Sequence, residues 1–175
     1  MKTKNVIALI IVFALGIATG VFARGKAIDP ATYRGKSKQE AAKALLEVAK
    51  TQAGKGSWEN IAVGRVFLAG GMKDEGRAMF ESVTSKKPEP SDWMRIGRAY
   101  YDAGDWDAAK DAFDKAVPKN SKDAAWLAEI GAYYNLKGDR ARAEELFERS
   151  FAIESGEVWH TTNIAGSYVG VEPLR

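Results

Sequence analysis

The chain has few residues that could carry out catalytic chemistry. His160 is its single histidine and cysteine is absent, so no catalytic triad, thiol nucleophile or multi-histidine metal site can be assembled. Five aspartates gather between positions 102 and 114, but their spacing lacks the glycine and the terminal glutamate of an EF-hand calcium loop. No P-loop, dinucleotide-binding glycine pattern or nucleophile elbow is present. We therefore expect no enzymatic activity, no cofactor and no metal site.

Two arginines offer binding chemistry instead. Arg65 and Arg98 each directly follow a glycine and lie 33 positions apart. A guanidinium group binds a carboxylate through two parallel hydrogen bonds, so the two side chains could hold a carboxylate or an acidic peptide if the fold brings them together. Ordinary salt bridges to nearby acidic residues are the competing interpretation. Which of these two interpretations applies depends on where the secondary-structure elements place the arginines.

A pattern of apolar residues, glycine and aspartate repeats along the chain with a period of 34 positions. Its first copy is Ile96, Gly97, Tyr100, Gly104, Asp105, Ala109 and Phe113, and its second is Ile130, Gly131, Tyr134, Gly138, Asp139, Ala143 and Phe147. Each copy holds two helical patterns. The glycine between them fits the left-handed turn after a helix, and the aspartate fits the cap of the next helix. This period indicates stacked helical repeats.

The spacing resembles that of the tetratricopeptide repeat family, W-x2-L-G-x2-Y followed by A-x3-F. Ile96 and Ile130 stand where the family more often has leucine. The resemblance implies an all-α fold, a right-handed solenoid of helix-turn-helix repeats. It also implies that the protein binds proteins or peptides and has no catalytic role.

The repeat register divides the chain into segments. Residues 57–156 are expected to form three repeats, which are 57–90, 91–124 and 125–156. A capping helix is expected on each side, in residues 37–56 and 157–175, since solenoids close their ends in this way. The first of these begins with a capping box, Ser37 to Glu40. Residues 24–36 are expected to form a basic linker.

Residues 1–23 have the layout of a secretory signal peptide. Two lysines precede an apolar run, which ends in small residues. A membrane anchor is the alternative, because residues 6–23 carry no charge and are just long enough to span a bilayer. Basic residues follow the run, and under the positive-inside rule they oppose export. We expect export to the periplasm or cell envelope, with anchoring to the inner membrane by residues 6–23 as the alternative.

The resemblance also implies a binding surface, because the first helix of each tetratricopeptide repeat lines a concave groove. With Ile96, Gly97 and Tyr100 facing the core, helical geometry leaves another stripe exposed. The predicted groove residues are Ile61, Arg65, Leu68, Met94, Arg98, Tyr101 and Asn135. Alanines at the remaining positions, Ala128 and Ala132, argue against a full carboxylate clamp. Trp58 or Trp159 could anchor a partner, although tryptophan in such proteins more often fills the core.

Charge distribution argues against nucleic acid as the partner. The net charge is +3, but residues 56–175 hold sixteen basic and twenty acidic side chains, a balance of −4. The positive charge therefore lies near the amino terminus, away from the repeats. We expect a non-catalytic adaptor of the cell envelope that holds a partner protein or peptide. The alternatives are a periplasmic assembly chaperone with broad hydrophobic binding, and a structural protein whose repeats self-associate into homo-oligomers.

Overall fold

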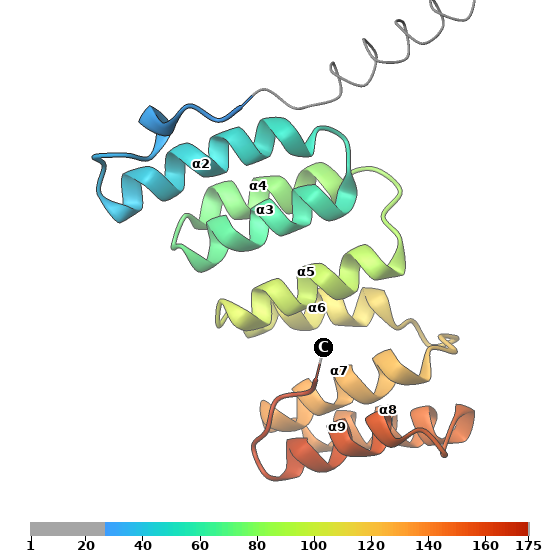
Figure 1. Cartoon of the computed structure of the whole chain (residues 1–175). Coiled ribbons are helices and arrows are strands. Elements are labelled where there is room, and N and C mark those ends of the chain that lie inside the picture. The colour runs from blue at the N-terminus through green and yellow to red at the C-terminus, as the bar shows by residue number, and fades with distance from the viewer. Residues whose placement is uncertain (1–26, 175) are drawn as a thin grey trace, which may run out of the picture. The chain divides into compact units, whose positions relative to one another are not determined.

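The structure, a computed structural model, describes residues 27–174. All regular elements in this range are helical (Figure 1). A 3-10 helix, η1 (Pro30–Thr32), is followed by eight α-helices, which are α2 (Lys38–Ala53), α3 (Ser57–Ala69), α4 (Lys73–Thr84), α5 (Pro90–Asp102), α6 (Trp106–Ala116), α7 (Ala124–Leu136), α8 (Arg140–Ile153) and α9 (Val158–Tyr168). None of these helices combines the length and the apolar character needed to cross a bilayer. The predicted signal peptide or anchor, residues 1–23, lies outside the described residues.

The chain divides into two units, residues 1–45 and 46–175. In the first unit, Asp29 caps η1 by accepting a hydrogen bond of 2.9 Å from the backbone N–H of Ala31. The capping box of α2 is present: the Ser37 N–H donates to Glu40 Oε2 at 3.0 Å and the Glu40 N–H donates to Ser37 Oγ at 3.3 Å. The Ser37 hydroxyl also donates to Glu40 Oε2, at 2.7 Å. This bond, together with the one from the Ser37 N–H, favours the ionised carboxylate and lowers the pKa of Glu40.

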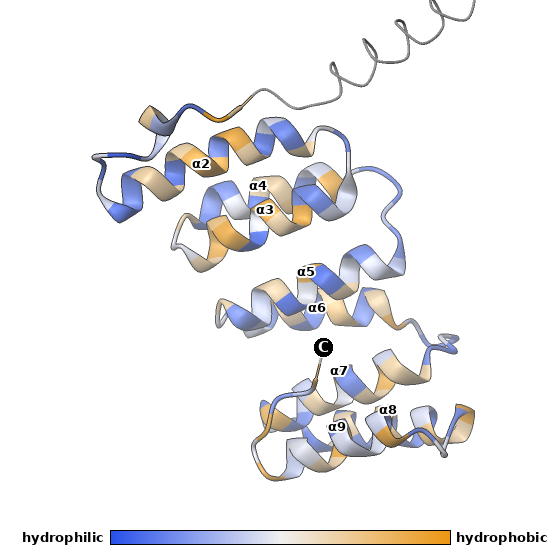
Figure 2. Cartoon of the chain, in the orientation of Figure 1, coloured by the Kyte–Doolittle hydropathy of each residue, from blue (hydrophilic) through white to orange (hydrophobic). Residues whose placement is uncertain are grey.

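The second unit consists of helix pairs packed around a series of apolar clusters. Helix α3 packs against α4, α5 against α6 and α7 against α8, while α9 packs against α7. One cluster joins the end of α2 to α3 and α4, the next joins α3–α6, and the third joins α5–α9. Each labelled helix carries both hydrophilic and hydrophobic segments (Figure 2), as expected for helices that turn one face to their neighbours. The predicted all-α solenoid of helix-turn-helix repeats is confirmed.

Within each pair, a glycine of the first helix receives a phenylalanine ring of the second. The three contacts are Gly64 with Phe80, Gly97 with Phe113 and Gly131 with Phe147. A Cβ atom at Gly131 would lie 2.6 Å from Cε1 of Phe147, closer than van der Waals contact permits. The repeated glycine is therefore explained by helix packing, since any side chain there would push the two helices apart.

The turns inside the pairs follow the predicted glycine and aspartate pattern. Gly104 and Gly138 have φ angles of 76° and 86°, in the left-handed region where glycine carries no steric cost. Asp105 and Asp139 then accept hydrogen bonds from backbone N–H groups in the first turns of α6 and α8, at 3.4 and 3.2 Å. In the first pair Met72 occupies this cap position and supplies no side-chain hydrogen bond.

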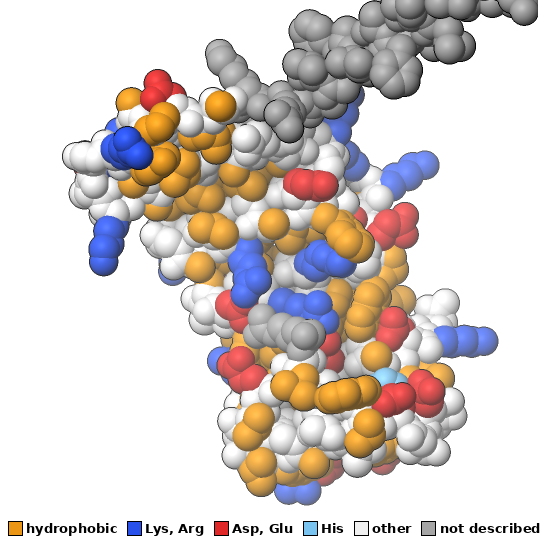
Figure 3. Space-filling view, in the orientation of Figure 1, with side chains coloured by type: hydrophobic (Ala, Val, Ile, Leu, Met, Phe, Trp, Pro, Cys, Tyr) orange, Lys and Arg blue, Asp and Glu red, His pale blue; other side chains and the backbone are white. Residues whose placement is uncertain are grey.

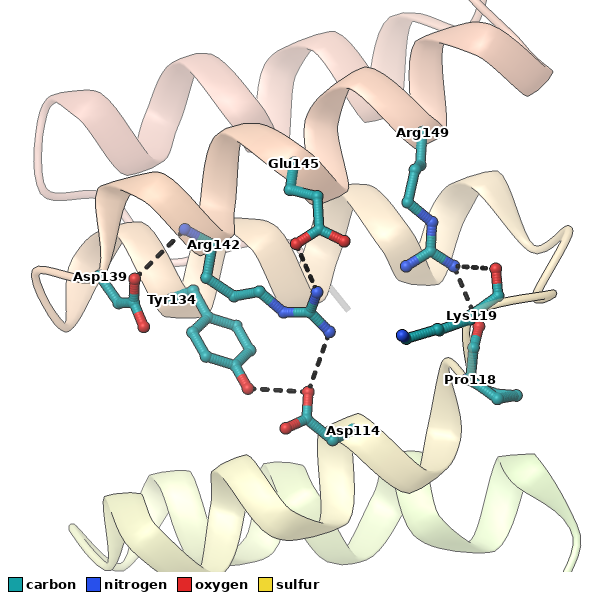
Figure 4. Close-up of polar contacts among 8 residues, drawn as sticks. All are labelled: Asp114, Pro118, Lys119, Tyr134, Asp139, Arg142, Glu145 and Arg149. Carbon is teal, nitrogen blue, oxygen red and sulfur yellow. Dashed lines mark hydrogen bonds and ion pairs between the residues drawn. The ribbon is translucent and has the colours of Figure 1, made fainter.

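A polar network links α6, α7 and α8 (Figure 4). Asp114 Oδ1 accepts a hydrogen bond of 2.9 Å from the Tyr134 hydroxyl and one of 3.3 Å from Nη2 of Arg142. Arg142 Nη1 also donates to Glu145 at 2.6 Å. Burial is the main cause that raises the pKa of the Tyr134 phenol, and the bond to Asp114 adds to it. This network ties the second helix pair to the third.

Candidate partner-binding groove

A pocket of about 510 Å³ opens between α3 and α5, the first helices of two successive pairs. Its lining residues from α3 are Trp58, Glu59, Ile61, Ala62 and Arg65, and those from α5 are Arg95 and Arg98. Basic side chains gather over α3 and α5 on the face shown in Figure 3, with acidic side chains beside them. This pocket contains three of the predicted groove residues, Ile61, Arg65 and Arg98.

Arg95 is stacked on an exposed tryptophan. Its guanidinium carbon lies 3.6 Å from the centroid of the Trp58 ring, and Nη1 donates to the Ser91 carbonyl at 3.2 Å. Trp58 is 56% exposed. Among residues 27–174 no carboxylate forms an ion pair with Arg95. The stack holds the guanidinium plane in place and leaves its edge as a site for a carboxylate of a partner.

Arg98 binds a buried glutamate of the next helix pair. Its Nε and Nη2 donate to Glu129 Oε1 and Oε2 at 2.7 and 2.6 Å, in the two-bond geometry of a guanidinium and a carboxylate. The Tyr133 hydroxyl donates to the same carboxylate at 3.2 Å. The Glu129 side chain is only 7% exposed. Arg98 is thus mainly a structural link between α5 and α7.

Arg65 occupies the same repeat position but has a different partner. Its Nη2 lies 3.0 Å from Asp102 Oδ2, and its side chain is 57% exposed. Arg98 binds Glu129 of the following helix pair. One repeat earlier, the position that corresponds to Glu129 is occupied by Arg95. Arg65 therefore finds a residue of its own charge at that position instead of an acceptor. Within the described part of the chain, Arg65 and Arg98 are therefore paired with acidic residues, whereas Arg95 has no acidic partner.

Three predicted groove residues are buried instead. Ile61 and Leu68 are each 3% exposed and Met94 is 1% exposed. Ile61 and Leu68 belong to the apolar cluster between α3 and α6, and Met94 belongs to the cluster that reaches α9. Ile61 contributes a buried wall to the pocket, whereas Leu68 and Met94 do not line it. The prediction of an exposed stripe through these residues was wrong, because the neighbouring helix pairs cover that side of α3 and α5.

Tyr101 and Asn135 lie outside the pocket as well. The Tyr101 ring is 4.4 Å from the ring of Tyr133 and 6.3 Å from that of Trp106, centroid to centroid. Asn135 Nδ2 donates to the Ser167 hydroxyl at 2.9 Å and so connects α7 to α9. Both side chains are half-buried and are engaged in packing between repeats.

The exposed stripe of α3 and α5 keeps the predicted Arg65 and Arg98, but has Ala62 in place of Ile61 and Arg95 in place of Met94. On α3 it runs through Trp58, Ala62 and Arg65, and on α5 through Arg95 and Arg98. The sequence analysis missed Glu59, Ala62 and Arg95. The i, i+4, i+7 spacing of Trp58, Ala62 and Arg65 could have identified Ala62, because these positions share one helix face. Arg95 lies 33 positions after Ala62, at the same place in the repeat.

The groove offers charged and apolar groups that can bind a ligand. Its polar groups are guanidinium groups and the Glu59 carboxylate, and its apolar surface comes from Trp58 and Ala62. In the part of the chain that the structure describes, no three His, Asp or Glu side chains converge as metal ligands would. The arrangement can hold an acidic group by Arg95 and an apolar group on the tryptophan.

The fold defines a helical repeat protein. The family model of the tetratricopeptide repeat matches residues 93–117, which include most of α5 and all of α6. The match supports the tetratricopeptide resemblance that the repeat spacing predicted, over one helix pair of the chain. No curated protein was found to match it. Tetratricopeptide repeats serve protein–protein interaction, and this coarse function follows from the match.

Proposed function

We propose that this chain is a non-catalytic adaptor of the cell envelope that holds an acidic segment of a partner protein in the groove between α3 and α5. The observation that carries the proposal is Arg95, which is stacked on Trp58 in a pocket of about 510 Å³ and has no acidic partner among residues 27–174. A carboxylate of the partner would form an ion pair with Arg95. An apolar side chain next to it would cover the tryptophan.

The envelope location rests on residues 1–23. Their charge and apolar pattern favours export, and anchoring by residues 6–23 remains the alternative. Mass spectrometry of the chain purified from native cell fractions checks this part of the proposal. A mature amino terminus at Arg24 in the soluble envelope fraction supports export, and an intact Met1 in the membrane fraction supports the anchor. An intact chain in the cytosol contradicts both.

Binding is tested with the full chain and a library of synthetic peptides. Each acidic peptide is paired with a counterpart in which asparagine and glutamine replace the acidic residues. We expect the acidic member to bind more tightly, and added salt to weaken it, since surface charges are screened. The substitution Arg95→Ala should reduce that affinity at least tenfold. Lys110→Ala is the matched control, because Lys110 is an exposed cation of α6 outside the pocket.

The test separates the adaptor from its main alternative. An assembly chaperone with broad hydrophobic binding would prefer apolar peptides regardless of charge, and neither Arg95→Ala nor salt would matter. Equal binding of the acidic and amide peptides would therefore refute the proposed groove. A photoreactive amino acid at Ala62, which is exposed and lines the pocket, identifies the partner in cells. Its cross-link should disappear with Arg95→Ala.

A further inference from the structure

A second pocket, of about 310 Å³, is lined by residues of α4, α5 and α6. We call it the α4–α6 pocket. It shares no residue with the groove between α3 and α5. Phe80, Trp93 and Tyr100 give it aromatic surface, and Glu81 and Asp111 give it carboxylates. Aromatic faces and carboxylates are the two kinds of group that attract an organic cation.

The next boundary in the stack, between the second and third helix pairs, holds a cation at the corresponding place. Arg142 of α8 donates to Asp114 of α6 at 3.3 Å and to Glu145 of its own helix at 2.6 Å (Figure 4). The Tyr134 hydroxyl donates to the same oxygen of Asp114 at 2.9 Å. The guanidinium at this boundary is therefore bound by one acid from each of two successive second helices.

The repeat register relates the residues of this network to four residues that line the α4–α6 pocket. The four are Glu81, Tyr100, Ala108 and Asp111, which correspond in that order to Asp114, Tyr134, Arg142 and Glu145. The shift is 33 positions for Glu81 and 34 positions for the other three. Both acids and the tyrosine are thus retained, whereas alanine replaces the arginine. The methyl group of Ala108 supplies no charge to the acids and fills less of the space between them.

The α4–α6 pocket has two basic side chains of its own, and neither replaces Arg142. Arg77 Nη2 lies 3.0 Å from Asp105 Oδ2, outside the set of corresponding acids. Lys115 Nζ lies 2.6 Å from Asp111 Oδ2, but the two side chains are 46% and 67% exposed and stand four positions apart on one helix. Such a pair contributes only about 0.3–0.5 kcal/mol, so a stronger cation can displace Lys115.

Glu81 and Tyr100 supply the remaining polar groups of the site. Among residues 27–174 the Glu81 carboxylate forms no ion pair, and the Tyr100 hydroxyl forms no hydrogen bond. The corresponding groups one repeat later, Asp114 and Tyr134, are hydrogen-bonded to each other and Asp114 is paired with Arg142. The α4–α6 pocket therefore has the acceptors of a guanidinium site without the guanidinium.

We propose that the α4–α6 pocket binds an arginine side chain of a partner protein, at the place that Arg142 occupies one repeat later. The guanidinium of the partner binds Glu81 and Asp111, and the aliphatic part of its side chain lies on the aromatic surface. Arginine is favoured over lysine because its planar group has donors for two carboxylates at once. A protein is the expected source, since tetratricopeptide repeats serve protein–protein interaction. The inference does not depend on the function proposed for the groove, which takes an acidic group.

Short peptides with blocked ends test the site in the full chain in mild detergent. Three peptides of the form Gly-X-Gly carry arginine, lysine or citrulline, which has nearly the shape of arginine without its charge. The NMR signal of the Trp93 indole N–H reports binding, because Trp93 lines the pocket. We expect the arginine peptide to shift this signal saturably and the other two to bind at least tenfold more weakly. Equal binding of the arginine and citrulline peptides, or of the arginine and lysine peptides, would overturn the proposal, as would the absence of a saturable shift.

Two substitutions in the pocket have matched controls elsewhere in the chain. Glu81→Gln should weaken binding of the arginine peptide at least tenfold, whereas Glu148→Gln, at the same repeat position in α8 and outside the pocket, should not change it. Ala108→Arg supplies the guanidinium from within the chain, so it should abolish peptide binding and raise the melting temperature. Ala78→Arg makes the same change at an exposed position of α4 outside the pocket and should do neither.

The outcomes also separate this site from the groove. Arg95→Ala, which removes the free cation of the groove, should leave binding of the arginine peptide unchanged. An arginine peptide that binds Ala108→Arg as tightly as the natural chain would contradict the proposal, as would equal effects of Glu81→Gln and Glu148→Gln. Circular dichroism checks that each variant keeps the helical content of the natural chain, so that a loss of binding is not a loss of folding.

Discussion

Arg98 and Glu129 form a two-bond ion pair across the boundary between the second and third helix pairs, at 2.7 and 2.6 Å. The glutamate is buried and the arginine is 25% exposed. Arg65 holds the equivalent position one repeat earlier, where Arg95 takes the place of Glu129. It pairs with the more exposed Asp102 instead. The two arginines therefore have different roles although they hold the same repeat position. Arg98 connects α5 to α7, whereas Arg95, which stands in place of a glutamate, adds positive charge to the groove.

The first prediction concerns this ion pair. Arg98→Ala leaves the Glu129 carboxylate buried without its guanidinium, and we expect a loss of about 3 kcal/mol in the free energy of unfolding. Arg65→Ala is the control, because its exposed pair with Asp102 contributes less than about 1 kcal/mol. Urea denaturation of the two variants measures the difference. Similar losses for both would mean that burial of Glu129 has no influence on stability.

The second prediction concerns the glycine that receives a phenylalanine ring. Gly131→Ala adds a Cβ atom 2.6 Å from the Phe147 ring, and we expect it to destabilise the protein by roughly 1–3 kcal/mol through overpacking. Gly166→Ala is the matched control in α9, where the nearest atom is 3.5 Å away, at an ordinary contact distance. There the better helix propensity of alanine should stabilise the protein by up to about 1 kcal/mol. Thermal unfolding should therefore move in opposite directions for the two variants.

The sequence predicted the fold because its signals were local and repeated. Gly104 and Asp105 mark a turn and a cap by backbone chemistry alone, and Gly138 and Asp139 repeat the signal in register. The repeated pairing of glycine with a phenylalanine in the following helix added a packing signal. Each signal agreed with the others, so the all-α repeat architecture could be predicted from the chain without knowledge of its contacts.

The groove was predicted only in part because it depends on contacts between repeats. A first helix in the stack is covered by its own partner and by neighbouring pairs, so its exposed stripe is narrow. An error of one residue, about 100° around the helix, moved the predicted stripe from Arg95 to the buried Met94. The pairing of Arg98 with Glu129 likewise joins residues 31 positions apart, and nothing in the local sequence separates that ion pair from a free binding arginine. The division into repeats and capping segments stays a prediction.

The third prediction concerns the response to alkaline pH. Burial and the bond to Asp114 raise the pKa of Tyr134 in the folded chain, whereas an unfolded tyrosine titrates near pH ~10. Above that pH the unfolded chain loses the phenolic proton and the folded chain keeps it, so stability is fully present below about pH 10 and falls as the pH rises further. Tyr134→Phe should lose less stability than the natural chain between about pH 8 and about pH 11. Urea denaturation at the two pH values measures this, and an unchanged pH dependence would contradict it.

The fourth prediction separates a helix cap from an ion pair. Asp105 and Asp139 both cap a helix, but Asp105 also accepts a hydrogen bond of 3.0 Å from Arg77 of α4. Asp139→Ala should cost about 1 kcal/mol through loss of the cap, and Asp105→Ala should cost more. Asp105→Ser, which retains a capping hydroxyl, should recover most of the loss and leave only the contribution of the exposed ion pair, below about 1 kcal/mol. Denaturation midpoints that rank Asp139→Ala as the more damaging change would count against this account.

The fifth prediction concerns the shape of the cation in the groove. Arg95→Lys keeps the positive charge but replaces a planar guanidinium, stacked 3.6 Å from the Trp58 ring centroid, with a compact ammonium that makes no two-bond contact with a carboxylate. If the groove recognises a carboxylate by this geometry, the lysine variant should bind the acidic peptide about tenfold more weakly than the natural chain. This loss would be close to the effect of Arg95→Ala, because hydrogen bonds to a charged group contribute about 1.5–3 kcal/mol. If the groove supplies only positive charge, the lysine variant should bind nearly as well as the natural chain. Isothermal titration calorimetry at two salt concentrations distinguishes the outcomes, because the geometric part of the affinity persists when salt screens the charge.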